Sequence, residues 1–313
     1  MTTRLDWSPF VGHKNAPRLD FAQEQEKARL NEIAARMRLN VMKMMCAADY
    51  GHPISCLGLA DLFTALFFGN ALRYDAKNPV WEGRDRLVVS NGHISALLYT
   101  ALSMAGYFPA SDLANYARTG GLPGHPHFDL NRGVELSSGS LGQGVSVSVG
   151  MAIALKPLRR DVFLIASDGE AQEGQVWEAL QSAVKYNLSN LKIFLDCNGI
   201  QNSGRIKDVM PSGNLEKTFS AMGFEVAVCH NASAFEITQT IKEQKPSDKP
   251  FLCLLNTIGG KGVSFMEDNP FWHDEIPVGK LRQKALEELN NLKRKADSWK
   301  IFLAQMETSP CRR

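Results

Sequence analysis

Two short apolar runs in the middle of the chain each end abruptly in polar residues. Residues 162–166 lead into Asp168-Gly169-Glu170, and residues 193–195 lead into Asp196-Cys197-Asn198. Between the two runs, apolar residues recur every four positions, which is the spacing of one helix face: Val176, Leu180, Val184 and Leu188. The pattern predicts a strand, a turn, a helix and a second strand, arranged as a right-handed βαβ unit.

Apolar spacing predicts further elements on both sides of this unit. Expected helices cover residues 26–48, 94–107, 142–155, 234–245 and 278–306, and expected strands cover residues 224–229 and 251–257. Strands that alternate with helices indicate an α/β fold with one doubly wound parallel sheet and helices on both faces. We expect a single domain over residues 1–313, with an irregular segment over 1–20 and a helical segment over 278–313.

Composition and charge exclude several classes of partner. The 313 residues are 44% hydrophobic and carry a formal net charge of +2, which argues against nucleic acid or a membrane surface as the main partner. No secretory signal is visible, and no apolar stretch approaches the length of a membrane span. The six cysteines form no CxxC pair, so the sequence predicts neither a zinc site nor a disulfide framework. Scattered cysteines of this kind indicate a reducing, cytoplasmic location.

Asp168 and Asn198 follow the two central predicted strands and should therefore lie at one edge of the sheet. The carboxyl ends of parallel strands form the edge at which α/β folds bind ligands. One carboxylate and one amide oxygen suit a hard divalent cation, which takes water and phosphate oxygens as its other ligands. Gly169 lets the backbone approach a phosphate closely. An ordinary βαβ unit with polar turns is the alternative that this segment alone leaves open.

Four segments, taken in order, resemble the transketolase family. The separation of Asp168-Gly169 from Asn198 is similar to the thiamine diphosphate motif, and three upstream segments match the family's pattern: Asp49-Tyr50-Gly51-His52-Pro53, residues 84–93 ending in Ser90-Asn91-Gly92-His93, and Gly124-His125-Pro126 followed by residues 138–144. The similarity covers about residues 25–280, and nothing here resembles the two later domains of full-length transketolases. The chain is therefore similar to the N-terminal, diphosphate-binding half of a split transketolase.

The resemblance implies a thiamine diphosphate-binding fold and a site for that cofactor with a divalent cation. Mg²⁺, with Ca²⁺ or Mn²⁺ as alternatives, would be held by the side chains of Asp168 and Asn198 and by the carbonyl oxygen of Ile200. Gly169 would donate its backbone N–H to the diphosphate, and the backbone of Leu141 would contact the aminopyrimidine. The other cofactor-binding residues that the resemblance implies are His93, Gly139, Glu170 and His273.

The resemblance also implies catalytic roles for four histidines and one carboxylate. His93 and His273 would approach the diphosphate and the reacting carbon, while His52 and His125 would hold oxygens of the donor substrate. Imidazoles suit these tasks because they donate hydrogen bonds and exchange protons near neutral pH. Glu173 would belong to a proton relay near the subunit interface. Three residues depart from the family's usual Gly, Pro and Gly: Ser167, Ser140 and Asp274.

The activity implied is transfer of a two-carbon ketol unit from a ketose phosphate to an aldose. In this family, the carboxylate that activates the aminopyrimidine lies in the second domain, and we find no candidate for it here. We therefore expect a separate C-terminal subunit, an α2β2 assembly and sites at its interfaces. The alternatives are a specialised relative that forms an acyloin or an unusual sugar, the α subunit of a 2-oxo acid dehydrogenase, and a catalytically silent binding subunit.

Overall fold

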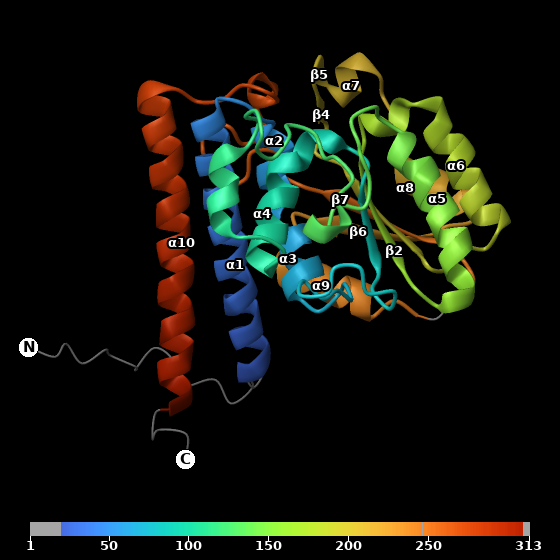
Figure 1. The fold of residues 1–313 in the computed structure, drawn as a ribbon, viewed down its shortest axis with the longest axis horizontal. Helices are drawn as coiled ribbons and strands as arrows, with labels where there is room; N and C mark the ends of the chain where they lie inside the picture. The colour runs from blue at the N-terminus through green and yellow to red at the C-terminus, as the bar shows by residue number, and fades with distance from the viewer. Residues whose placement is uncertain (1–19, 246, 309–313) are drawn as a thin grey trace, which may run out of the picture.

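A five-stranded parallel sheet runs through the middle of the protein, with helices on both faces (Figure 1). The computed structural model describes residues 20–245 and 247–308. The strand order is β1-β2-β3-β7-β6, and the strands are β1 (Arg86–Val89), β2 (Val162–Ser167), β3 (Leu191–Asp196), β6 (Glu225–His230) and β7 (Phe251–Asn256). This arrangement confirms the predicted α/β class. The irregular segment expected over residues 1–20 lies, except for Asp20, outside the described residues.

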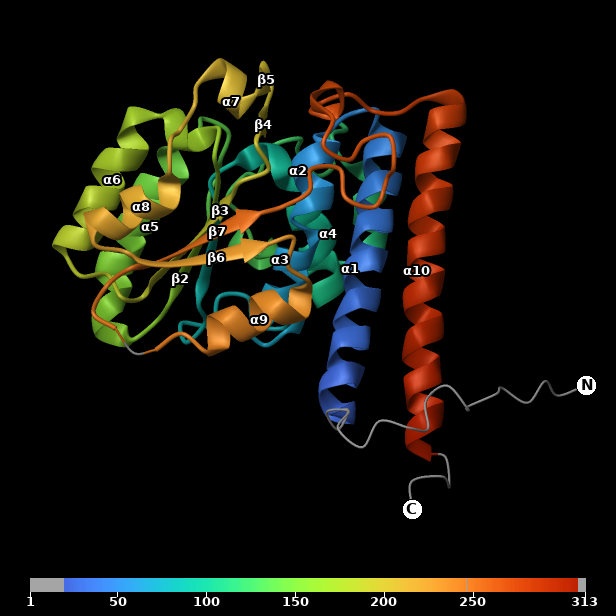
Figure 2. The ribbon, with the colours of Figure 1, turned by 180° about the vertical axis from the view of Figure 1, so that it is seen from behind.

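Alternate residues of the strands face two separate hydrophobic cores. In β2, Ile165 belongs to the core shared with one layer of helices, whereas Leu164 belongs to the core on the opposite face. The first layer contains α1 (Phe21–Ala48), α2 (Pro53–Gly58), α3 (Ala60–Phe68), α4 (Ser95–Ala105), α9 (Ala234–Lys242) and α10 (Gly279–Thr308); the second contains α5 (Gln143–Leu155), α6 (Gly174–Lys185) and α8 (Leu215–Met222) (Figure 2). Because both faces are covered, the central strands read as continuous apolar runs.

The direction in which the chain moves from strand to strand across the sheet explains which helix lies on which face. The chain moves outward from β2 through α6 to β3, and then through α8 to the edge strand β6. It returns through α9 to β7, which lies between β3 and β6. Right-handed crossovers that run in opposite directions place their helices on opposite faces of a sheet. The helix α9 is therefore found on the face opposite α6 and α8.

Most predicted elements are present, with boundaries that local chemistry shifts by a few residues. The helix α1 begins at Phe21 and not at residue 26, because the Asp20 side chain accepts hydrogen bonds from the backbone N–H groups of Ala22 and Gln23 at 3.1 and 3.2 Å. The predicted helix 94–107 is shorter and ends at Ala105, and the predicted helix 234–245 ends at Lys242.

Several elements were not expected from the sequence. The helices α2 and α3 are mostly apolar and buried on nearly all sides, so their apolar residues show no helical period. The strand β1 has only four residues and follows the charged segment Arg84-Asp85. A small hairpin of β4 (Ile200–Gln201) and β5 (Gly204–Arg205), followed by the short helix α7 (Ile206–Val209), stands above the carboxyl edge of the sheet (Figure 1).

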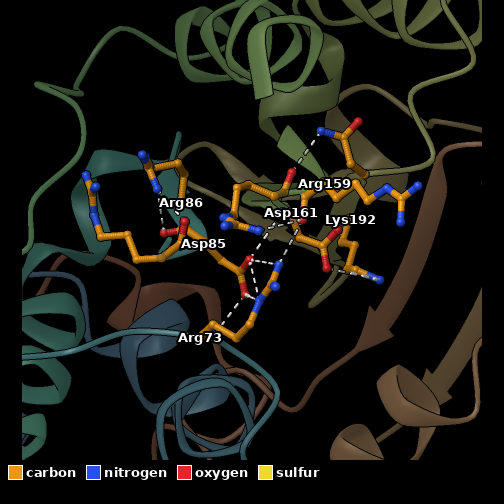
Figure 3. A network of polar contacts seen from close by, with 9 residues as sticks. Arg73, Asp85, Arg86, Arg159, Asp161 and Lys192 are labelled. Atoms are coloured by element: carbon orange, nitrogen blue, oxygen red, sulfur yellow. Dashed lines mark hydrogen bonds and ion pairs between the residues drawn. The ribbon is translucent and has the colours of Figure 1, made fainter. Parts of the chain in front are cut away.

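The amino-terminal edge of the sheet is fixed by a polar network (Figure 3). The Asp85 carboxylate, just before β1, accepts hydrogen bonds from the Arg73 guanidinium at 2.6 Å and from the backbone N–H of Asp161, just before β2, at 3.2 Å. Lys192, in β3, lies 3.9 Å from the Asp161 carboxylate. The starts of three neighbouring strands are thus tied together, far from the edge at which their carboxyl ends meet.

The two longest helices, α1 and α10, pack side by side at one flank of the protein (Figures 1 and 2). Ion pairs link them at Arg282–Asp49, 3.2 Å, and at Lys300–Glu32, 3.8 Å. The prediction of a C-terminal helix is therefore correct over residues 279–308. Within the described ranges, no helix has both the length and the apolar character needed to cross a lipid bilayer.

Candidate functional site

Two buried carboxylates lie at the adjacent carboxyl ends of β2 and β3. Ser167 and Asp196 are partners in the parallel register, and the backbone N–H of Asp168 donates to the carbonyl oxygen of Asp196 at 2.9 Å. The Asp168 carboxylate accepts hydrogen bonds from the N–H groups of Gly169 and Gly199, each at 2.8 Å. Gly199 adjoins Asn198, so the structure brings Asp168 and Asn198 together as the βαβ pattern predicted.

The orientation of the Asn198 amide is fixed by its neighbours. Its Nδ2 donates to Asp196 Oδ2 at 2.8 Å and to Ser55 Oγ at 3.4 Å, while its Oδ1 accepts from the backbone N–H of Ile200 at 2.8 Å. Gly199, between Asn198 and Ile200, has φ +72°, a left-handed conformation that favours glycine. The turn therefore holds the amide oxygen of Asn198 beside the backbone of Ile200.

The charge of these carboxylates is not balanced by a basic residue. Burial raises the pKa of Asp168 to about 6 and that of Asp196 to about 7, and no lysine, arginine or histidine of the described chain offsets either shift. Nor do three or more His, Cys, Asp or Glu side chains gather anywhere in that part of the chain to hold a metal alone. The residues fit a divalent cation that takes part of its oxygen ligands from phosphate, because such a cation would supply the missing positive charge.

Four histidines from four different segments form a cluster beside these strand ends. The His52 ring is central: its centroid lies 5.1 Å from that of His93, 5.7 Å from that of His273 and 6.4 Å from that of His125. The His93 and His273 centroids are 6.0 Å apart. The phenol oxygen of Tyr50 lies 3.3 Å from Nδ1 of His125. The structure thus brings together all four histidines that the sequence singled out.

The four histidines are partly buried, which favours their neutral form, and two of them have free hydrogen-bonding capacity. Burial and, to a lesser extent, the neighbouring imidazoles lower the pKa of His52 to about 4 and that of His93 to about 3. The pKa values of His125 and His273 are lowered by burial as well. Nδ1 of His52 and Nδ1 of His273 are buried and have no partner among the described residues. Such atoms are rare in native proteins and point to a ligand or a bound water.

The low pKa of His52 predicts a specific loss of stability in acid. The unfolded state, with an ordinary value near 6.5, binds a proton before the folded state does, so the free energy of unfolding falls as pH drops from about 6.5 toward about 4. At pH 5, His52 should account for about 2 kcal/mol of this loss. Urea unfolding at pH 7.5 and pH 5 should show that His52→Asn loses less stability than the unsubstituted protein.

An exposed histidine provides the control for this measurement. His230, at the end of β6, is exposed and hydrogen-bonded to Asn256 at 3.0 Å. His230→Asn, which removes an imidazole outside the cluster, is the matched control variant. Equal acid-induced losses in the His52→Asn variant and in the unsubstituted protein would contradict the assignment of a buried neutral imidazole to His52.

The loop that carries His273 is anchored to the elements around it. The backbone N–H of Gly260 donates to the carbonyl oxygen of Ile54, in the helix that His52 caps, at 2.9 Å. Lys261 Nζ lies 2.8 Å from the buried Asp61 carboxylate, which also pairs with Arg38 at 2.5 Å. These contacts hold His273 near His52 even though 220 positions separate them in the sequence.

A pocket of about 260 Å³ lies between the strand ends and the histidine cluster. An open groove of about 670 Å³ is lined by His125 and the exposed His127. Asp168 is buried, and Gly139 is exposed; a Cβ atom at Gly139 would lie 3.6 Å from Cδ2 of His125. The predicted site residues that line the smaller pocket are His93, Leu141, Gly169, Glu170, Glu173, Asn198, Ile200 and His273.

Several residues of the site were not found by sequence reasoning. Asp196 orients Asn198, and its only signal was a polar residue at the end of an apolar run. Ser55 lines the pocket from α2, a helix that the sequence did not reveal. Gln175 binds the carbonyl oxygen of Leu141 at 2.9 Å from the start of α6, and nothing in the sequence distinguished it from a surface glutamine.

Comparison with known proteins assigns this chain to a family. Residues 30–276 match the family model described as "Transketolase, thiamine diphosphate binding domain". The transketolase of Campylobacter jejuni superimposes with a TM-score of 0.77 at 30% sequence identity, over 89% of this chain and 47% of that chain. The chain belongs to the transketolase family and carries its thiamine diphosphate-binding domain, as the sequence predicted.

Separate subunits match the chain over nearly their whole length. An apulose-4-phosphate transketolase subunit of Actinobacillus succinogenes is 35% identical over 88% of this chain and 99% of that protein. The 6-deoxy-6-sulfo-D-fructose transketolase subunit SqwG of Clostridium sp. is 36% identical over 88% of this chain and 97% of that protein. By contrast, the chain covers 40% of the transketolase of Rhodobacter capsulatus, with 35% identity. These matches confirm the predicted N-terminal half of a split transketolase and the transferase class.

Proposed function

We propose that this chain binds thiamine diphosphate through a divalent cation and, with a C-terminal partner, transfers a two-carbon ketol unit from a ketose phosphate to an aldose. The observation that carries the proposal is the meeting of Asp168, Asn198 and Ile200, with no balancing basic residue in the described part of the chain, beside two partly buried histidines. Mg²⁺ is the expected cation, with Ca²⁺ or Mn²⁺ as alternatives, because its oxygen ligands match this donor set.

The strand-end residues would hold the cation and the diphosphate. Asp168 and Asn198 contribute side-chain oxygens and Ile200 its carbonyl oxygen. Asp196 and Ser55 keep the nitrogen of the Asn198 amide turned inward, which leaves its oxygen for the cation. The Gly169 N–H, which donates to Asp168, would be shared with a phosphate oxygen.

The histidines would surround the reacting end of the cofactor and the donor sugar. When bound, thiamine diphosphate supplies the carbon centre that accepts the two-carbon unit. His93 and His273 line the pocket and would donate hydrogen bonds to phosphate oxygens and near the reacting carbon. His52 and His125 would bind hydroxyl and carbonyl oxygens of the donor, and neutral imidazoles can both donate and accept there. Glu173, exposed at the rim of the pocket, would join a proton relay with the neighbouring subunit.

The partner would close the site over the carboxyl edge of the sheet. Large apolar side chains are exposed in segments that adjoin the site: Phe128 next to His127, Met210, whose carbonyl oxygen accepts from Gln172, and Phe271, two residues before His273, have 59%, 58% and 64% of their surface accessible. Exposed apolar groups that gather around a site are typical of a protein interface. We infer an α2β2 assembly in the cytoplasm, in which the second subunit supplies the carboxylate that activates the aminopyrimidine.

The sugar is inferred only as a class. The relatives named above act, by their names, on apulose-4-phosphate and on 6-deoxy-6-sulfo-D-fructose. We infer that this chain also uses a ketose phosphate or a related anionic sugar, and a specialised pathway sugar is the second candidate for its substrate. The relatives favour a transketolase over the α subunit of a 2-oxo acid dehydrogenase.

Removal of a cation ligand tests the proposed site. In the assembled complex, Asp168→Ala or Asn198→Ala should weaken retention of thiamine diphosphate by about an order of magnitude or more, because each removes an oxygen from a hard-cation site. Isothermal titration calorimetry with thiamine diphosphate and Mg²⁺ measures the effect. Asp248→Ala, at an exposed position, is the matched control. Unchanged affinity in both site variants would place the cation elsewhere.

A further inference from the structure

We propose that Glu170 and Gln175 are positioning residues that hold the peptide between Leu141 and Gly142 in the wall of the pocket. The inference rests on the proposed function, in which this pocket takes thiamine diphosphate. Both residues follow the Asp168-Gly169 turn, in the segment that leads into α6 and through its first turn. The peptide that they hold lies in a different segment, at the start of α5.

Both polar atoms of this peptide unit are bound by side chains. Nε2 of Gln175 donates to the carbonyl oxygen of Leu141 at 2.9 Å. The backbone N–H of Gly142 donates to Oε1 of Glu170 at 2.6 Å. A peptide plane held at its oxygen and at its nitrogen cannot rotate without breaking one of the two hydrogen bonds. We call these two hydrogen bonds, from Gln175 and to Glu170, the clamp. The clamp fixes the direction in which the backbone and side chain of Leu141 face the pocket.

The conformation of Gly142 fits this clamp closely. Gly142 has φ +84°, and a Cβ atom at this position would lie 2.8 Å from Cγ of Gln175. A larger residue would meet both a strained backbone and the Gln175 side chain. The Gln175 chain thus lies directly against the peptide, which explains why the turn before α5 carries a glycine.

Glu170 is buried completely and joins three segments of the site. Its Oε1 also accepts a hydrogen bond from the hydroxyl of Ser90, three residues before His93, and its backbone N–H donates to Ser167 Oγ at 3.2 Å. A carboxylate that accepts from the N-cap residue of α5 is favourable, because helix N-termini carry partial positive charge. This oxygen is committed to the protein. Through this oxygen Glu170 acts on the Leu141 loop, whereas its Oε2 is buried without a partner among the described residues and stays available for the cofactor contact that the resemblance implied.

The clamp connects the two ends of the proposed ligand site. Asp168 and Gly169 lie at the end proposed for the diphosphate, and Leu141 lies at the wall proposed for the aminopyrimidine. If Gln175 positions only the wall at Leu141, loss of its side chain should weaken binding of the whole cofactor. Binding of a ligand that consists of diphosphate alone should not change. Inorganic pyrophosphate is such a ligand.

The experiment compares two ligands on the assembled complex. Isothermal titration calorimetry measures the affinity for thiamine diphosphate and for inorganic pyrophosphate, each with Mg²⁺, in Gln175→Ala and in the unsubstituted protein. We expect Gln175→Ala to weaken thiamine diphosphate binding about threefold to tenfold, the usual effect of one lost hydrogen bond, and to leave pyrophosphate binding unchanged. Gln181→Ala, an exposed position of the same helix, is the control.

A second pair of variants tests Glu170. Glu170→Gln retains an acceptor oxygen and should keep most of the affinity, whereas Glu170→Ala should lose as much as Gln175→Ala, with faster amide hydrogen exchange at Gly142. Native affinity in Gln175→Ala, or equal losses for both ligands, would overturn the clamp. If the unsubstituted complex does not bind thiamine diphosphate, the proposed function fails first, and the inference fails with it.

Discussion

Purified alone, the chain is expected to show no measurable ketol transfer, and addition of a C-terminal transketolase subunit should restore the activity. The reason is chemical: activation of the aminopyrimidine requires a carboxylate beside its ring nitrogen, and in this family that carboxylate lies in the second domain. Two buried carboxylates near the pocket are held by the protein at one or both oxygens, and only Oε2 of Glu170 lacks a partner among these four oxygens. Asp196 binds Thr257 and Asn198, and one oxygen of Glu170 binds Ser90 and Gly142.

The measurement is a ketol-transfer assay on the two proteins separately and on a mixture of them. The activity of the mixture should saturate as the second protein is added, and the Asp168→Ala variant in the same mixture should be much less active. Analytical ultracentrifugation of the mixture gives the mass of the assembly, which should match two copies of each chain. Full turnover by the isolated chain would contradict the need for a partner.

Alanine substitution of His52 or His125 is expected to lower kcat/KM for donor cleavage by about 10²- to 10⁴-fold, the usual contribution of one positioned acid–base or hydrogen-bonding side chain. His52 is central in the cluster, and its Nδ1 is buried without a partner among the described residues. The affinity for thiamine diphosphate should not change, because neither histidine lines the smaller pocket.

Single-turnover donor cleavage by the assembled, cofactor-saturated complex measures this effect. The loss should appear in the chemical step and not only as a raised KM, since the interaction strengthens in the transition state. His230→Ala is the matched control, because His230 is exposed and contacts Asn256 at the end of β7. If both site variants cleave donor at the native rate, the two histidines are structural and the proposed substrate site is wrong.

The sequence predicted best those parts of the site that lie at strand ends. Asp168 and Asn198 were placed together because parallel strands with a helix between them leave few arrangements for their carboxyl ends. The four histidines came from the resemblance: no spacing in the sequence shows that His273 lies near His52. Their approach depends on the anchored loop, in which Lys261 meets the buried Asp61.

The contacts that support the site could not be predicted in the same way. Gln175 and Ser90 are ordinary polar residues in sequence, and their importance arises only when α6, β1 and the turn before α5 meet in space. The helices α2 and α3 were missed because burial on all sides removes the polar face that makes a helix visible. A periodic pattern arises in the sequence only when one side of an element faces the core and another faces solvent. These two helices have almost no side that faces solvent.

The pairing of α1 with α10 has a consequence for how the protein is made. Contacts of α1 extend to α3, α4, α9 and α10, and its side chains are buried on several sides. On the ribosome, α1 emerges first among the described helices and α10 last. At translation rates of about 5–20 residues per second, roughly 13 to 50 seconds pass between the synthesis of α1 and that of α10, which packs against it. During that interval an apolar flank of α1 is open to chaperones and to aggregation, so slow synthesis or truncation within α10 should lower the soluble yield.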